Sequence, residues 1–363
     1  MRPGNPRFSS QRLGFCLALA SFLSVIGCAV TPGNPPPLSS AAGASSAAGT
    51  SAVASGPVLG YGWDQTAVGL RPIFGVPGAA QFGSPVFGGA TYNGAGVCAD
   101  KKYAVLTASN GQAFLALLPS GVPQQIADHL SAKEQIVISP SCSAALLYAS
   151  GASSALVILG LPGTPKVQVL DLSRAGLVTA ATVSDSGLVL VAASQTTGGF
   201  NVQAVSADGT ASEVTAVGGL GGMAFLPSTQ NALIADAARN TISLASNLPG
   251  NTALNIVATT ADHVMQPAAI ASSADGRWLI VANQNGAAIL RLDLTRQTPP
   301  AQIACNCMAA KLVPLNGNST FLLSDVTSGP VWTFDGDAPS PRIVFVPAIN
   351  KSAGAAGGTG ATR

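Results

Sequence analysis

The sequence predicts an all-β fold in which one short-stranded unit is repeated around a ring. Apolar runs of strand length recur every 41 to 47 residues, and turn-forming Gly, Pro, Asn, Asp and Ser separate them. A period in the low forties built from such runs is typical of a β-propeller, whose blades are four-stranded sheets. We therefore expect seven blades, or six if the partial first repeat does not form one. The runs end at Trp63, Ala108, Ala149, Ala192, Ala235, Ala282 and Ser324.

Composition limits the class of protein. Only 9% of the 363 residues are charged while 47% are hydrophobic, which argues against a disordered chain. Lysine and arginine form no cluster in the body of the sequence, so nucleic acid is not an expected partner. A regular repeat can extend one closed domain over a chain of this length.

The first 27 residues have the pattern of a secretion signal. Arg2, Arg7 and Arg12 precede an apolar run that is too short to span a bilayer with margin, and Cys28 follows a small residue at its end. This order resembles a bacterial lipoprotein signal peptide with its lipobox. The resemblance implies cleavage before Cys28 and acylation of its thiol, which would anchor the chain in the cell envelope, at the outer membrane or the periplasmic face of a membrane. An ordinary cleaved signal peptide is the alternative.

Two low-complexity segments flank the expected propeller at residues 57–349. Residues 28–56 are rich in Ala, Ser, Gly and Pro and cannot bury enough apolar area to offset their ordering entropy, so we expect a disordered tether. Residues 350–363 have the same character, and we expect a disordered tail. Removal of residues 1–27 leaves 14 basic and 15 acidic residues, so the mature chain is close to neutral.

The repeat is clearest over Pro267–Thr295, where an Asp275-Gly276 turn joins two strands. Gly221–Ser246 and Lys311–Phe334 follow the same course. The first copy begins too near the tether to carry its own inner strand. We therefore expect the ring to be closed by pairing strands from both chain ends, which would remove exposed sheet edges.

The pattern Pro-x-x-Ile-x-x-Ser-Ala-Asp-Gly-x-x-Leu-Ile-Val-Ala-Asn occupies Pro267–Asn283. It resembles the repeats of the YVTN and NHL families of bacterial seven-bladed β-propellers, and the resemblance extends over about residues 57–349. Such a repeat is a scaffold signature, so it implies a fold rather than an activity.

Polar residues follow several of the anchor residues, where the second strand of each blade turns into the third. Turns of this kind open on one face of a propeller, so these side chains are a candidate binding rim around a central depression. The alternative, which the residue types favour, is that each Asx side chain caps its own turn. The candidate rim consists of Asp64, Asp236, Arg239, Asn283, Asn285 and Asp325.

Cysteine usage is that of an oxidising compartment. Cys98 and Cys142 fall near the first turns of adjacent blades, so a disulfide between them is geometrically reasonable. The pairing of Cys305 and Cys307 stays open, because an extended Cys-x-Cys points its thiols to opposite faces. The only histidines are His129 and His263, so we expect structural cysteines, no metal site and no cofactor.

The sequence contains no nucleophile elbow, phosphate-binding loop or zinc-protease motif. We therefore expect a non-catalytic binding or scaffold module, anchored to the membrane through its lipid, with an envelope protein, a peptide or a glycan as its partner. The alternative is a propeller enzyme of lactonase or lyase type with its site at the central pore. A histidine beside Asp64, Asp236 or Asp325 would favour the enzyme.

Overall fold

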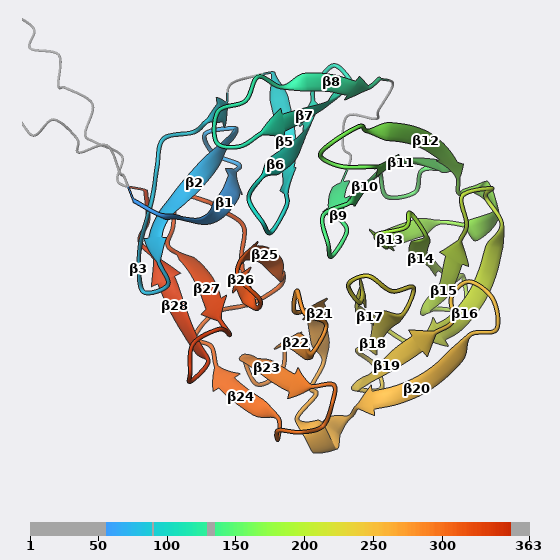
Figure 1. The fold of residues 1–363 in the computed structure, drawn as a ribbon. Helices are drawn as coiled ribbons and strands as arrows, with labels where there is room; N and C mark the ends of the chain where they lie inside the picture. Colours follow the sequence, from blue (N-terminus) through green and yellow to red (C-terminus); the bar gives the residue numbers. More distant parts are fainter. Residues whose placement is uncertain (1–55, 89–90, 129–134, 350–363) are drawn as a thin grey trace, which may run out of the picture. The chain divides into compact units, whose positions relative to one another are not determined.

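The computed structural model describes residues 56–88, 91–128 and 135–349, all within the larger of two compact units, Ala52–Arg363. These residues form seven four-stranded antiparallel sheets arranged around a central axis (Figure 1). The prediction of an all-β, seven-bladed propeller is confirmed. The expected signal peptide, Cys28, almost all of the tether and the tail lie outside the described residues. No helix in the described part of the chain is long and apolar enough to cross a membrane.

Each blade is one consecutive stretch of chain. Blade 1 contains β1 (Val58–Asp64), β2 (Gly69–Val76), β3 (Ala79–Phe82) and β4 (Phe87–Gly88), and blade 2 contains β5 (Tyr92–Val97), β6 (Tyr103–Ala108), β7 (Ala113–Leu117) and β8 (Gln124–Ala127). Blade 3 contains β9 (Gln135–Ile138), β10 (Ala144–Tyr148), β11 (Ser154–Leu159) and β12 (Lys166–Asp171), and blade 4 contains β13 (Val178–Val183), β14 (Val189–Ser194), β15 (Phe200–Val205) and β16 (Ala211–Val217). The 3-10 turn η1 (Ser173–Ala175) joins them.

The second half of the ring continues in the same way. Blade 5 contains β17 (Leu220–Phe225), β18 (Ala232–Asp236), β19 (Thr241–Ser246) and β20 (Ala253–Ala258), and the 3-10 turn η2 (Thr260–Asp262) follows it. Blade 6 contains β21 (Pro267–Ser272), β22 (Trp278–Asn283), β23 (Ala288–Asp293) and β24 (Ala301–Ala304). Blade 7 contains β25 (Val313–Asn316), β26 (Thr320–Leu322), β27 (Val331–Asp335) and β28 (Arg342–Val346).

The second strand of a blade forms most of the core. Every residue of β6 and of β10 is buried. Such a strand is covered on both faces by the neighbouring blades, so both sets of alternating side chains are apolar. This packing explains why the sequence shows an unbroken apolar run once in each repeat.

Strand β1 of blade 1 is equivalent to the second strands of the other blades. Trp63 pairs with Leu70 as Ala235 pairs with Ile242 in blade 5, and a four-residue loop follows in both hairpins. The last loop residue has a positive φ in each, 49° at Val68 and 56° at Asn240. Trp63 is therefore the anchor of a true blade, and the alternative of six blades is wrong.

Blade 1 differs from the others at its innermost position. Leu70 of β2 pairs with Trp63 of β1 on one side and with Phe87 of β4 on the other, so β3 and β4 together form the outer edge. Among the described residues no strand lies inside β1. The expectation that the first repeat lacks an inner strand of its own agrees with this arrangement.

The expected closure by strands from both chain ends is not seen in the part of the chain that the structure describes. No sheet combines strands from the two ends. A single parallel bridge joins Asp64 to Val326, where the Gln65 N–H donates to the Val326 carbonyl at 3.3 Å. Apolar packing closes the rest of the ring, since Leu59 of β1 lies in one buried cluster with Leu315 of blade 7.

A lysine adds a polar link at this closure. The Lys101 ammonium group, from the first turn of blade 2, donates to the Val58 carbonyl of blade 1 at 2.9 Å and to the Asn316 side chain of blade 7 at 2.6 Å. Burial lowers the pKa of Lys101, partly opposed by the nearby Asp100 carboxylate. One side chain therefore joins three blades.

We predict that Lys101→Met lowers the free energy of unfolding by about 1–3 kcal/mol, because it leaves the Val58 carbonyl and the Asn316 amide oxygen unpartnered. Lys102→Met is the matched control, since the Lys102 side chain is 70% exposed and pairs only with Asp100. Urea unfolding of both variants measures the effect. Equal stability of the two variants would show that Lys101 does not hold the closure.

Candidate functional site

The central channel contains a cavity of about 400 Å³. Its wall comes from the innermost strands of blades 2–7 and from β1, which surround the axis in Figure 1. Small residues let these strands converge: a Cβ at Gly96 of blade 2 would come within 2.5 Å of Ile136 in blade 3. Apolar side chains dominate the lining, among them Trp63, Ile138, Met223, Phe225 and Ile270.

One charged pair lies on this lining. The Lys311 ammonium group contacts both carboxylate oxygens of Asp325, at 2.7 and 2.9 Å. The two side chains are 51% and 42% exposed, so the pair is accessible to solvent. Lys311 and Asp325 are the only charged residues that the described lining contributes. A ligand in the channel would therefore meet a wall of apolar and uncharged polar side chains with one charged position.

Two carboxylates of the candidate rim, those of Asp64 and Asp236, accept hydrogen bonds from the loops of their own hairpins. Asp64 accepts hydrogen bonds from the N–H groups of Thr66 and Ala67, at 2.8 and 3.0 Å, and pairs with Arg71 at 2.6 Å. Burial opposes its ionisation, but these bonds outweigh burial and lower the pKa of Asp64. Asp236 accepts from the N–H groups of Ala238 and Arg239 in the equivalent loop.

Asp236 also accepts from the Gly218 and Gly219 N–H groups of the chain that enters its blade. Asn283, at the same position of blade 6, likewise holds the incoming chain. Its side chain accepts from the Met265 N–H at 3.1 Å and donates to the His263 carbonyl at 2.8 Å. Asp64, Asp236 and Asn283 are all buried. Asp64 and Asp236 cap their own turns, as the alternative expectation describes, whereas the bonds of Asn283 support the preceding loop.

The other three rim residues are exposed. Arg239 and Asn285 lie in the hairpin loops that follow Asp236 and Asn283, and Asp325 pairs with Lys311. These loops share one face of the propeller, which we call the hairpin face. His263 is also exposed, and within the described residues no hydrogen bond or ion pair joins its side chain to Asp64, Asp236 or Asp325. His129 lies outside the described residues.

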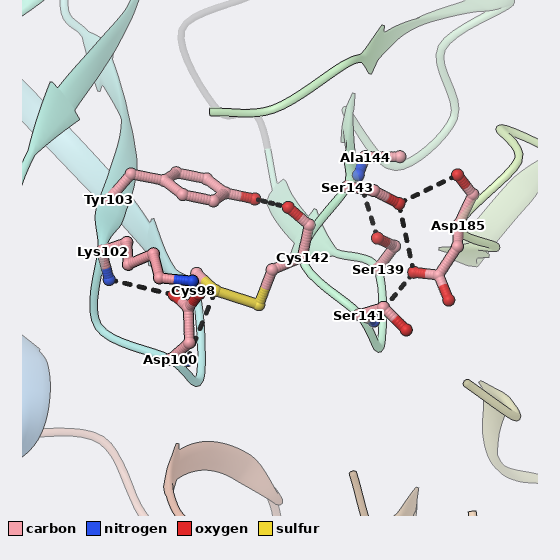
Figure 2. Close-up of a disulfide and its surroundings, with 10 residues drawn as sticks. All are labelled: Cys98, Asp100, Lys102, Tyr103, Ser139, Ser141, Cys142, Ser143, Ala144 and Asp185. Carbon is pink, nitrogen blue, oxygen red and sulfur yellow. Dashed lines mark hydrogen bonds and ion pairs between the residues drawn. A yellow bond between two sulfur atoms is a disulfide. The ribbon is translucent and has the colours of Figure 1, made fainter. Parts of the chain in front are cut away.

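The opposite face is tied together from blade to blade. We call the turns between the first and second strands of blades 2–7 the turn belt. Cys98 of blade 2 and Cys142 of blade 3 form a disulfide across it, with their Cα atoms 5.5 Å apart, and the Tyr103 hydroxyl donates to the Cys142 carbonyl at 2.8 Å (Figure 2). The Asp100 carboxylate lies beside both sulfurs. Because the sulfurs are bonded to each other, they act here as a clamp rather than as thiolate ligands.

Asp185 of blade 4 extends the belt in both directions. Its carboxylate accepts from the Ser141 N–H of blade 3 and from the Ser228 N–H of blade 5, each at 2.8 Å. Figure 2 shows the side toward blade 3, where the Ser143 hydroxyl also donates to the Asp185 carbonyl at 3.0 Å. Burial raises the pKa of Asp185, but these hydrogen bonds outweigh it and the net pKa is lowered.

The belt continues to blade 7. The Ser272 hydroxyl of blade 6 donates to the Phe225 carbonyl of blade 5 at 3.1 Å. Asn318 of blade 7 accepts from the Asp275 N–H at 2.8 Å and donates to the Asp275 carboxylate at 2.9 Å. With Lys101 at the closure, every pair of neighbouring blades is linked on this face.

Sequence reasoning missed the links of the turn belt. Lys101, Asp185 and Asn318 stand in short polar turns that give no individual signal. A usable signal was their spacing, because Asp185 lies 44 residues after Ser141 and 43 before Ser228, which is one repeat. A polar residue in one copy of the turn therefore bonds to the same turn in the next copy.

No known protein-family model matches this chain, and no curated protein matches it in sequence. Solved structures share its fold. A functionally unknown protein from Desulfotomaculum acetoxidans is 14% identical with a TM-score of 0.55, covering 80% of this chain and 99% of that one. Streptogramin B lyase is 14% identical with a TM-score of 0.51, covering 72% and 84%. Apo AztD from Citrobacter koseri is 12% identical with a TM-score of 0.52, covering 77% and 80%.

Identities this low show a shared fold alone. The shared fold agrees with the resemblance of the sequence repeat to YVTN- and NHL-type propellers.

We predict that Asp185→Asn destabilises the protein at neutral pH by about 1.5–3 kcal/mol, since the Asn amide would present N–H groups to the Ser228 N–H or the Ser141 N–H. The pKa of Asp185 is lowered in the fold, so its contribution is complete above about pH 4 and is lost as the pH falls further. The stability gap to wild type should therefore be constant from pH 7 to about 5 and shrink at lower pH.

Chemical denaturation across this pH range tests the prediction, with the exposed Glu213→Gln as the control. A gap that widens in acid would contradict the assigned role of Asp185.

Proposed function

We propose that this chain is a lipid-anchored binding module of the bacterial cell envelope, which holds a protein or peptide segment at the hairpin face of its channel. The Lys311–Asp325 pair carries the proposal, because it places a solvent-accessible charged position on the wall of a cavity lined by apolar and uncharged polar side chains. A concave apolar site with a few polar groups is the usual form of a binding site. The exposed Arg239 and Asn285 extend the polar surface on the same face.

We favour a peptide over a glycan as the ligand. The wall combines aromatic, aliphatic and small side chains on its β-strands with hydroxyl and amide groups, and such a surface can take the side chains and backbone of an extended peptide. The charged pair would orient one ionic group of the peptide. A glycan is the other outcome that the test below can return.

The proposed anchor is the acylated Cys28, supported by the order of basic residues, apolar run and cysteine in the sequence. The following segment to residue 56 would hold the propeller away from the membrane surface. This arrangement leaves the propeller free to meet partners in the envelope.

Lys311→Glu tests the binding site, because it puts two carboxylates where an ion pair stands now. We expect crosslinking in the native envelope to a partner protein to fall about tenfold, which corresponds to about 1.4 kcal/mol. Lys166→Glu, on the exposed edge strand β12, is the control and should crosslink as wild type does. An equal loss of crosslinking in both variants, or a loss in neither, would refute the channel site. Capture of a glycan without any protein would show that the ligand is a glycan and not a peptide.

Cys28→Ala tests the anchor. We expect the variant to leave the membrane fraction, because no acyl chain can then be attached. Cys16→Ala, within the apolar run of the same segment, should stay with the membrane. The measurement is the distribution of each variant between membrane and soluble fractions, and an unchanged membrane fraction for Cys28→Ala would disprove the lipoprotein assignment.

A further inference from the structure

The connection between blades 6 and 7 contains a disulfide with a single residue between its cysteines. Cys305 and Cys307 are bonded, with their Cα atoms 5.0 Å apart. The chain bends at Asn306 and Cys307, so the extended form in which the two thiols would point apart is not adopted. Cys305 is buried, and its N–H donates to the Ala287 carbonyl at 2.7 Å. Cys307 is half-buried and the next residue, Met308, is 95% exposed, so Cys307 is the cysteine nearer to solvent.

This disulfide is poorly suited to a structural role. A disulfide stabilises a fold mainly by restricting the unfolded chain, and the restriction grows with the length of the closed loop. Cys98 and Cys142 are 44 residues apart, and their bond joins two blades. Cys305 and Cys307 are 2 residues apart, and their bond joins two points of a single connection. Accessible disulfides are reduced more easily than buried structural ones. Cys307 is half-buried, whereas Cys98 and Cys142 are both buried.

The bond also lies beside the proposed binding surface. Ala287, whose carbonyl accepts from the Cys305 N–H, ends the hairpin loop that carries the exposed Asn285. Lys311 follows Cys307 by four residues in the same connection and pairs with Asp325. A protein held at the hairpin face would therefore lie close to this connection.

We propose that Cys305–Cys307 is a redox-active disulfide that exchanges with a dithiol of an envelope protein, while Cys98–Cys142 is structural. A thiolate of the partner attacks the Cys307 sulfur, the Cys305–Cys307 bond breaks, and Cys305 leaves as a thiolate that takes up a proton. The partner's second thiolate then attacks the mixed disulfide at the partner's sulfur and releases Cys307. The partner loses two electrons and gains a disulfide, and this chain gains two thiols.

Redox titration of the full chain with glutathione buffers tests the proposal. Free thiols are alkylated at each potential and assigned by peptide mass spectrometry. We expect Cys305 and Cys307 to become reduced under conditions in which Cys98 and Cys142 remain bonded. Reduction of both pairs together, or reduction of Cys98–Cys142 first, would overturn it.

Single-cysteine variants test which sulfur is attacked. In Cys305→Ser, the remaining Cys307 should react with oxidised glutathione at least about tenfold faster than the buried Cys305 does in Cys307→Ser. Equal rates would contradict the assigned order of attack. The double variant Cys305→Ser/Cys307→Ser should melt within about two degrees of wild type, while Cys98→Ser/Cys142→Ser should lose several degrees. A large loss of melting temperature in Cys305→Ser/Cys307→Ser would show that the Cys305–Cys307 bond is structural.

These measurements use glutathione and need no bound partner. If the two disulfides are not reduced in the expected order, the redox proposal fails and the proposed binding site is unaffected. If Lys311→Glu leaves crosslinking unchanged, the binding-site proposal fails and the redox proposal is unaffected.

Discussion

The Lys101 ammonium group joins blades 1, 2 and 7 where the ring closes. A propeller closes when its first and last blades meet, and only short, protected sheet edges then remain. Here the meeting is made by an apolar cluster around Leu59 and Leu315, by the bridge from Asp64 to Val326, and by Lys101, which bonds to blades 1 and 7 from blade 2. No strand is shared between those two blades in the described residues.

The two faces of the propeller serve different purposes. The turn belt is bonded from blade to blade through the Cys98–Cys142 disulfide, Asp185 and Asn318, and we expect these bonds to restrict movement between blades. The hairpin face keeps Asp64, Asp236 and Asn283 inside its loops and leaves other polar groups to solvent. Rigidity on one face and exposed chemistry on the other is what a binding scaffold needs.

The repeat could be found from sequence because the packing that creates it is uniform. Second strands such as Tyr103–Ala108 are buried on both faces and appear as apolar runs. The Asx side chains after the anchors were also visible, and their local hydrogen bonds follow from residue type, as at Asp236. These features depend on near neighbours in the chain or on the period itself.

Contacts at the ring closure could not be found in this way. Lys101 and Asn316 are 215 residues apart, which is about five repeats. The repeat places both residues near the same turn of their blades, but it does not show that blades 2 and 7 meet, because that contact depends on how the ring closes. The exposed pair of Lys311 and Asp325 depends on how an irregular connection folds back onto the channel. Irregular segments lack the alternation of polar and apolar residues from which position can be inferred.

A double-mutant cycle between Lys101 and Asn316 tests the account of closure most directly. Unfolding free energies of wild type, Lys101→Met, Asn316→Ala and the double variant give the coupling between the two side chains. If Lys101 closes the ring by bonding across it, the coupling should be about 1 kcal/mol or more. Additive effects within about 0.3 kcal/mol would contradict that account, because the two residues would then not depend on each other.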